Sequence, residues 1–413
     1  MTPELKNNRN FRWLMAGSAL SLTGDQFTLI ALPWLVLKLS GDPLSLGLVL
    51  ALMGVPRAVF ILIGGAIVDR YSPKRVLMLS KHASAVLLGV LALLVLSGSA
   101  SLGAVYVLAL LIGLAQAFGI PSATSVMPLS IPRELLQGAN GVLMGMRQMT
   151  TLAGPLLAAL LLAIADGQRA LGFAFAFDCV TFIVSAWTLS KVQPHAAPQS
   201  AQAASHVLRS VGEGIAAVWN DMEMRLCFFY WGLVSLLIGG VMQVALPLLA
   251  KERLHDGSAF GLLVAAHGAG MMLGMAASAV SARKFGAMRL GVAMLAVDVM
   301  AGFFLLPLGA ITETWQGIVL LVLLGLTPGY MQVAVFTWLQ SRVQPQMMGR
   351  TMSIFMFIFL GLAPLSAAFA GWLLQQLPLV VMFAGCGVVL IACAAGAWLF
   401  TPISRIGSKP LTR

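Results

Sequence analysis

Long apolar runs separated by short polar breaks dominate the chain. A helix needs about 20 mostly apolar residues to cross a bilayer. Runs of that length lie at about 12–38, 44–68, 76–98, 103–127, 140–164, 170–190, 226–250, 258–281, 288–308, 315–340, 350–373 and 377–400. Most breaks contain turn residues, as in Gly41-Asp42-Pro43. The pattern predicts an all-α polytopic membrane protein with twelve transmembrane helices.

A longer polar stretch after the sixth run divides the chain. Its first part, 193–205, is rich in Pro, Ala, Gln and Ser, a composition typical of linkers. Its second part, Val207 to Trp219, has apolar residues at helical spacing and fits an amphipathic helix on the membrane surface. We predict an N-terminal six-helix bundle at 1–190, a cytoplasmic linker at 191–225, and a C-terminal six-helix bundle with a short cytoplasmic tail at 226–413.

The two halves repeat one another. Ala31-Leu32-Pro33 recurs as Ala245-Leu246-Pro247, 214 positions later. The same offset relates further residues of the first half to identical residues of the second: Asp42, Gly47, Leu48, Ala51, Gly54 and Arg75. A register kept over this length indicates that the halves arose by duplication.

Composition and charge support a membrane location. Hydrophobic residues make up 59% of the chain and charged residues 9%, whereas soluble domains carry about 25% charged residues. The net charge of +11 does not indicate nucleic acid, because the basic residues cluster between apolar runs. With the N-terminus in the cytoplasm, nineteen Lys and Arg residues, Lys81 among them, lie inside and four outside. We therefore expect both termini in the cytoplasm, and a first run that is retained rather than cleaved.

The connection between the second and third runs contains a family motif. Gly65 is followed by Asp69-Arg70 and then by Lys74-Arg75. This spacing resembles the signature loop of the major facilitator superfamily. The resemblance implies two pseudo-symmetric six-helix bundles around a substrate near the midplane, with these five residues as a conformational latch between them. The second half has only a degraded copy, with Arg283 where Asp69 stands.

Other motifs are similar to those of exporters in this superfamily. Gly154-Pro155 resembles the fifth-span antiporter motif, and Pro364 answers it in the second half, so we assign all three to helix packing. Gly24-Asp25-Gln26 and the stretch 177–182 resemble bacterial exporters that include enterobactin and macrolide efflux proteins. The resemblance implies proton-coupled export across the bacterial inner membrane.

Ionisable residues inside apolar runs are candidate functional residues, because a charge in the bilayer costs several kcal/mol unless it is paired or faces a cavity. Six lie well inside: Asp25, Arg57, Arg147, Asp178, His267 and Asp298. Asp25 is near mid-depth at about 1.5 Å per residue and is the first candidate for proton coupling, followed by Asp178. The alternative for each is a buried carboxyl that joins neighbouring helices.

The other charged side chains allow two interpretations as well. Arg57 could pair with Asp25 or bind substrate, and Arg147 could bind an anionic group or pair with Asp178. The predicted substrate cavity adds apolar and polar residues to these, since flexible Met side chains suit varied ligands: Arg57, Arg147, Gln26, Trp34, His267, Met146, Met242 and Phe336. For any apolar member, core packing or lipid contact is the alternative.

The sequence therefore predicts a monomeric secondary active transporter that exports a small amphipathic molecule, drug-like or siderophore-like, by alternating access and proton antiport. Its partners would be the substrate, protons and the lipid bilayer, with no nucleic acid, cofactor or metal. Lipid or lysophospholipid flipping by the same fold remains open. An intramembrane enzyme is disfavoured because the five His are scattered and HExxH and GxSxG are absent. A sensor would normally carry an extramembrane domain.

Overall fold

The computed structural model describes residues 3–70, 72–164, 167–194, 212, 215–216, 218–285, 289–343 and 347–407. In these residues the chain is helical and forms no strand. Twelve helical segments are long and apolar enough to cross a membrane, which confirms the predicted all-α fold with twelve transmembrane helices. The predicted amphipathic helix at Val207 to Trp219 lies mostly outside the described residues.

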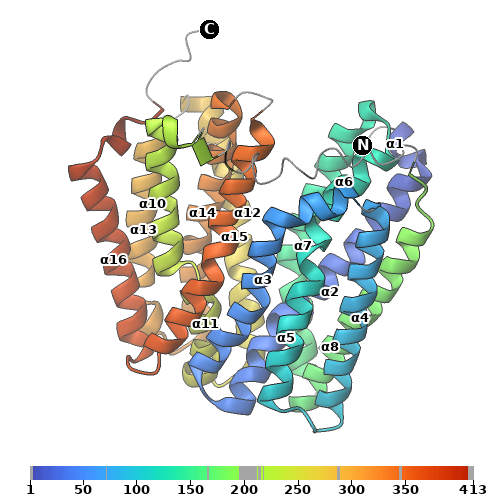
Figure 1. The fold of residues 1–413 in the computed structure, drawn as a ribbon. Coiled ribbons are helices and arrows are strands. Elements are labelled where there is room, and N and C mark those ends of the chain that lie inside the picture. Colours follow the sequence, from blue (N-terminus) through green and yellow to red (C-terminus); the bar gives the residue numbers. More distant parts are fainter. Residues whose placement is uncertain are drawn as a thin grey trace. The chain divides into compact units, whose positions relative to one another are not determined.

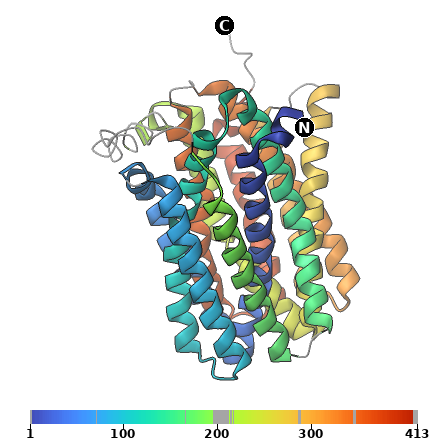
Figure 2. The same ribbon diagram turned by 90° about the vertical axis from the view of Figure 1, so that its right-hand side faces the viewer.

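The chain divides into two compact units, 1–209 and 210–413, and the division falls within the segment predicted as linker. The first unit contains helices α1 (Pro3–Asn7), α2 (Arg9–Ser40), α3 (Pro43–Arg70), α4 (Pro73–Leu96), α5 (Leu102–Ala117), α6 (Gly119–Ser130), α7 (Leu136–Ile164) and α8 (Gly167–Ser190). Within this unit α2 packs along α8, and α8 along α4 (Figures 1 and 2).

The second unit contains a similar series. Its helices are α10 (Met222–Ile238), α11 (Val241–Leu249), α12 (Gly257–Phe285), α13 (Leu290–Leu305), α14 (Thr314–Arg342), α15 (Met348–Leu373) and α16 (Leu379–Phe400). Here α12 packs along α14, α13 along α16, and α10 along α15.

Two of the predicted spans are each made of two helices. The fourth span breaks at Phe118, between α5 and α6, and the seventh breaks at Gly239-Gly240, between α10 and α11. A Cβ atom on Gly240 would lie 2.0 Å from the backbone nitrogen of Ala367 in α15. The glycine therefore permits a backbone contact that a side chain would block.

The turns after the first span of each half show how the repeat is built. Gly41 ends α2 in the left-handed conformation, at φ 68°, and His255, 214 residues later, has φ 54°. The next residue caps the following helix in both halves. Asp42 accepts from the N–H groups of Leu44 and Ser45, and Asp256 accepts from that of Ser258. The duplicated Asp residues thus have the same local role.

Glycines bring two pairs of helices into backbone contact. A Cβ on Gly113 of α5 would lie 2.4 Å from the carbonyl oxygen of Met53 in α3. In the second half, a Cβ on Gly325 of α14 would lie 2.2 Å from the carbonyl oxygen of His267 in α12. Gly270 faces α14 equally closely. Such small-residue contacts are a common way for helices to pack in membranes.

An ion-pair network joins the end of α14 to the start of α10. Arg342 donates to both carboxylate oxygens of Asp221, at 2.6 and 2.9 Å, and to Glu223 at 2.7 Å. Asp221 also caps α10 through the N–H groups of Glu223 and Met224. Burial alone would raise the pKa of Asp221, but the hydrogen bonds from Arg342 and from these N–H groups lower it below its ordinary value.

Candidate functional site

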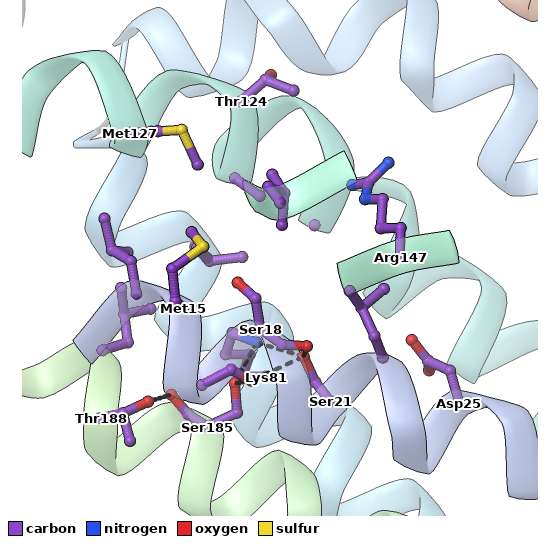
Figure 3. A pocket seen from close by; sticks show the side chains of 18 of the residues that line it. Met15, Ser18, Ser21, Asp25, Lys81, Thr124, Met127, Arg147, Ser185 and Thr188 are labelled. Atoms are coloured by element: carbon purple, nitrogen blue, oxygen red, sulfur yellow. Dashed lines mark hydrogen bonds between the residues drawn. The ribbon is translucent and has the colours of Figure 1, made fainter. Parts of the chain in front are cut away.

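A cavity of about 590 Å³ lies within the first unit, with walls from α2 to α8 (Figure 3). Among the described residues, four charged side chains line it: Asp25, Arg57, Lys81 and Arg147. Serine and threonine hydroxyls from α2, α6, α7 and α8 and apolar side chains such as Met144 complete the walls. The cavity thus offers both charged and apolar surface to an occupant.

The close packing of α2 on α8 directs Asp25 toward the cavity. Gly17 and Gly24, two helical turns apart, face α8, and a Cβ on Gly24 would lie 2.1 Å from Oγ1 of Thr181. Because α2 has 3.6 residues per turn, Asp25 stands about 100° around the helix from Gly24 and lies on the cavity wall. Asp25 is half-buried, and its carboxylate has no hydrogen-bond partner among the described residues. The neighbouring Gln26 also lines the cavity.

Arg57 of α3 lies close enough to Asp25 for the two charges to interact. Of the two alternatives left open for Arg57, the ion pair with Asp25 is not formed within the described residues, however. One of its terminal nitrogens donates to Oε1 of Gln116 in α5, and its buried Nε has no acceptor among the described residues. The guanidinium is therefore held by a neutral amide and retains an unused donor.

Lys81 of α4 is a cavity residue that the sequence interpretation missed. The positive-inside pattern groups it with the cytoplasmic basic residues, but it lies two turns after Lys74 along the helix and points into the cavity (Figure 3). Its Nζ donates to the hydroxyl of Ser185 at 2.6 Å and, more weakly, to that of Ser21 at 3.4 Å. The available signal was its position inside the apolar run 76–98, just before a long charge-free stretch.

Asp178 of α8 is fully buried in the interface with α2 and is absent from the cavity wall. Thr28 donates a short hydrogen bond to its Oδ2, and the Thr181 hydroxyl, which donates to the Asp178 carbonyl oxygen at 2.7 Å, also lies 3.2 Å from Oδ1. The alternative pairing of Asp178 with Arg147 is wrong. Arg147 is exposed on the cavity wall and makes no ion pair within the described residues.

The other predicted cavity residues occupy several environments. Met146 packs in the cluster around Phe11 and Leu5, and neither it nor Trp34 lines the cavity. Three belong to the second unit, where Phe336 packs edge-on against Phe355 at 5.5 Å and Met242 is half-buried in α11. His267 forms a hydrogen bond with the backbone of Leu321, while its Nδ1 has no partner among the described residues.

The latch residues are described only in part. Gly65, Asp69 and Arg70 belong to α3, but their side chains lie outside the described residues. Lys74 donates to the carbonyl oxygens of Ser190 and Val192 at the end of α8, at 3.1 and 2.6 Å. Arg75 is exposed.

The predicted packing motif lies inside two helices. Pro155 is within α7 and Pro364 within α15, and both are buried. A Cβ on Gly154 would lie 2.4 Å from Cγ of Gln26. Gly154 therefore makes room for the Gln26 side chain on the neighbouring α2.

Asp298 of α13, which has no evident partner in the sequence, accepts a 2.6 Å hydrogen bond from the Tyr230 hydroxyl of α10. Within the described part of the chain, no group of three or more His, Cys, Asp or Glu side chains could hold a metal ion. The four cysteines are free.

Comparison with known proteins identifies the family. The family model of the Major Facilitator Superfamily matches residues 14–365. Among curated proteins, the enterobactin exporter EntS of Escherichia coli O1:K1 / APEC is 25% identical over 348 residues, 84% of this chain and 80% of that protein.

Solved structures show the same fold. The nucleoside transporter NupG has a TM-score of 0.73 at 13% identity and covers 95% of this chain and 99% of its own. A bacterial homologue of the iron transporter ferroportin, in its inward-facing state, has a TM-score of 0.70 at 14% identity, covering 94% and 98%. The family model, the curated relative and these folds agree, and the chain belongs to the Major Facilitator Superfamily of multi-pass membrane transporters.

Proposed function

We propose that this transporter exports a small amphipathic molecule, drug-like or siderophore-like, from the cytoplasm across a bacterial inner membrane by proton antiport. Both termini would face the cytoplasm, and the monomer would work by alternating access. The similarity to an enterobactin exporter supports the direction and the substrate class. The observation that carries the proposal is the Asp25 carboxylate, which borders the cavity without a hydrogen-bond partner among the described residues.

Antiport requires that the proton and the substrate exclude each other. An ionised Asp25 can accept hydrogen bonds from hydroxyl or N–H groups of a substrate, whereas a protonated Asp25 has lost much of this capacity. Arg57 and Lys81 interact with the ionised form of Asp25. A substrate bound from the cytoplasm would use the ionised carboxylate, and a proton entering from the outside would replace it.

Asp178 would have a supporting role. It lies behind Asp25, and the two carboxylates are close enough to repel each other when both are ionised. The hydrogen bonds from Thr28 and Thr181 fix Asp178 between α2 and α8. We therefore assign the travelling proton to Asp25 and regard Asp178 as a group that tunes it.

The test uses inside-out vesicles that hold a proton gradient reported by a pH-sensitive dye. Catecholate siderophores and lipophilic cations are added in turn to vesicles with the wild-type protein, Asp25→Asn or Asp256→Asn. Asp256→Asn is the matched control, because Asn also caps helices well and Asp256 is exposed at the start of α12. A substrate should dissipate the gradient with the wild type and Asp256→Asn only. An equal response with Asp25→Asn would refute the role of Asp25.

A further inference from the structure

The charges on the cavity wall do not balance. Among the described residues of the lining, Arg57, Lys81 and Arg147 are cationic and Asp25 is the one acid. Within the described residues, none of the three cations forms an ion pair. A cationic side chain inside a membrane costs about 2.5–3.5 kcal/mol unless it is paired or hydrated. An anionic ligand in the cavity would therefore offset the cost of these two excess positive charges.

The hydroxyl groups around Lys81 fix its ammonium and leave one donor free. Ser185 and Ser21 both donate their protons to the carbonyl oxygen of Gly17, at 2.6 and 3.1 Å. Their oxygens can therefore only accept from Lys81, which they do. A lysine ammonium has three N–H donors, so the third remains for the cavity. The Phe182 ring, 5.6 Å from Nζ, closes one side.

Further donors line the same cavity. Ser18 lies one turn before Ser21 on α2, lines the cavity, and has no hydrogen-bond partner for its hydroxyl among the described residues. Arg147 extends from α7 on the other side of the cavity (Figure 3). Two cations and a free hydroxyl on three different helices thus face one space, while Asp25 lies two turns along α2 from Ser18.

We infer that Lys81, with Ser18 and Arg147, binds an anionic group of the substrate, such as a carboxylate or phosphate. The inference rests on the proposed function, because it treats this cavity as the transport site. An anion here would by itself favour protonation of Asp25. Antiport then requires that the substrate also donate hydrogen bonds to ionised Asp25. The substrate class is an apolar body with an anionic group at one end and hydroxyl or N–H donors at the other.

The experiment measures binding to the purified full-length protein in phosphatidylcholine nanodiscs by calorimetry. The probe is 6-hydroxy-2-naphthoate, and its cationic counterpart is 6-aminomethyl-2-naphthol. The variants are Lys81→Met, which removes the charge at similar volume, and Lys81→Arg, which keeps it. Lys6→Met, exposed on α1, is the matched control.

We expect the wild type and Lys6→Met to bind the anionic probe at least about tenfold more tightly than the cation. Lys81→Met should lose about tenfold or more, and Lys81→Arg less. Equal or tighter binding of the cation by the wild type would overturn the inference, and this comparison holds even if Lys81→Met does not fold. Unchanged affinity in a folded Lys81→Met would overturn it too.

A second arm identifies the source of the anionic group. In phosphatidylglycerol nanodiscs at equal ionic strength, a Lys81-dependent loss of probe affinity would support a lipid headgroup as the natural occupant. Unchanged affinity would support a soluble substrate. Since binding needs no proton gradient, failure here leaves antiport through Asp25 intact, and failure of antiport leaves the anion site intact.

Discussion

The backbone contact between α12 and α14 gives a prediction that the structure makes quantitative. In Gly325→Ala the new methyl group would lie 2.2 Å from the carbonyl oxygen of His267 and 3.0 Å from the nitrogen of Met271. A carbon and a carbonyl oxygen in contact stay about 3.3 Å apart, so the helices must separate by about 1 Å. A gap of this size removes about a quarter to a half of the dispersion energy of the contacts that it opens.

We expect the steric effect to be about 1–3 kcal/mol, as for overpacking elsewhere. Alanine stabilises a helix by about 1 kcal/mol relative to glycine, and this gain would mask part of the steric destabilisation. Gly385→Ala in α16 removes this ambiguity, because a Cβ there has open space around it. Both variants gain the same helix propensity, so the difference between their stabilities isolates the contact.

The measurement is the midpoint of thermal unfolding in detergent, followed by size-exclusion chromatography of a fluorescent fusion. Gly325→Ala should unfold at a lower temperature than the wild type and Gly385→Ala at the same or a higher one. If the two variants unfold together, α12 and α14 are not in backbone contact at Gly325 and the reasoning fails.

Three further results are expected. Arg342→Gln should lower stability by about 1 kcal/mol, since the lost ion pairs are partly solvent-exposed, and a denaturation series at neutral pH measures this. Folding lowers the pKa of Asp221, so its carboxylate contributes fully to the free energy of unfolding above the unfolded pKa of about 3.9. This contribution is lost as the pH falls through the lower pKa of the folded state. The wild type should therefore approach Arg342→Gln in stability as the pH falls below about 4, and a gap that does not narrow with falling pH would contradict the assignment. Thr28→Val should lower the free energy of unfolding by about 1–3 kcal/mol, because it removes a hydrogen-bond donor from buried Asp178. Thr28→Ser keeps the hydroxyl and should retain most of the wild-type stability. Equal stability of the Val and Ser variants would show that the hydroxyl is not needed.

Most of the fold could be predicted from apolar run length alone. Each predicted span corresponds to a helix or a pair of helices, as with 140–164 and α7 at Leu136–Ile164. Run length alone does not reveal the breaks at Phe118 and Gly239, because each lies inside a run long enough to be one span. They depend on tertiary contacts, such as the approach of Gly240 to α15, that run length does not encode.

The site could be predicted only in part. Depth along a span suggests Asp25 and Arg57, and the structure brings both to the cavity. Depth does not encode which side of a helix a residue occupies. Asp178 consequently lies in a helix interface, and Lys81, counted with a basic cluster, is in the cavity. The angular position of Asp25 depends on which glycines face α8.

The excess of positive charge in the described part of the cavity lining has an electrical consequence for the proposed cycle. An anion that leaves the cell carries negative charge outward, in the direction that an inside-negative potential favours, and each charge gains about 2.3 kcal/mol per 100 mV. That energy alone sustains a concentration ratio of about 50-fold. A proton that enters in exchange adds a second charge in the same electrical sense. Each transport cycle would then move net charge across the membrane. Turnover should therefore slow when a potassium ionophore clamps the voltage at zero, even while the pH gradient remains.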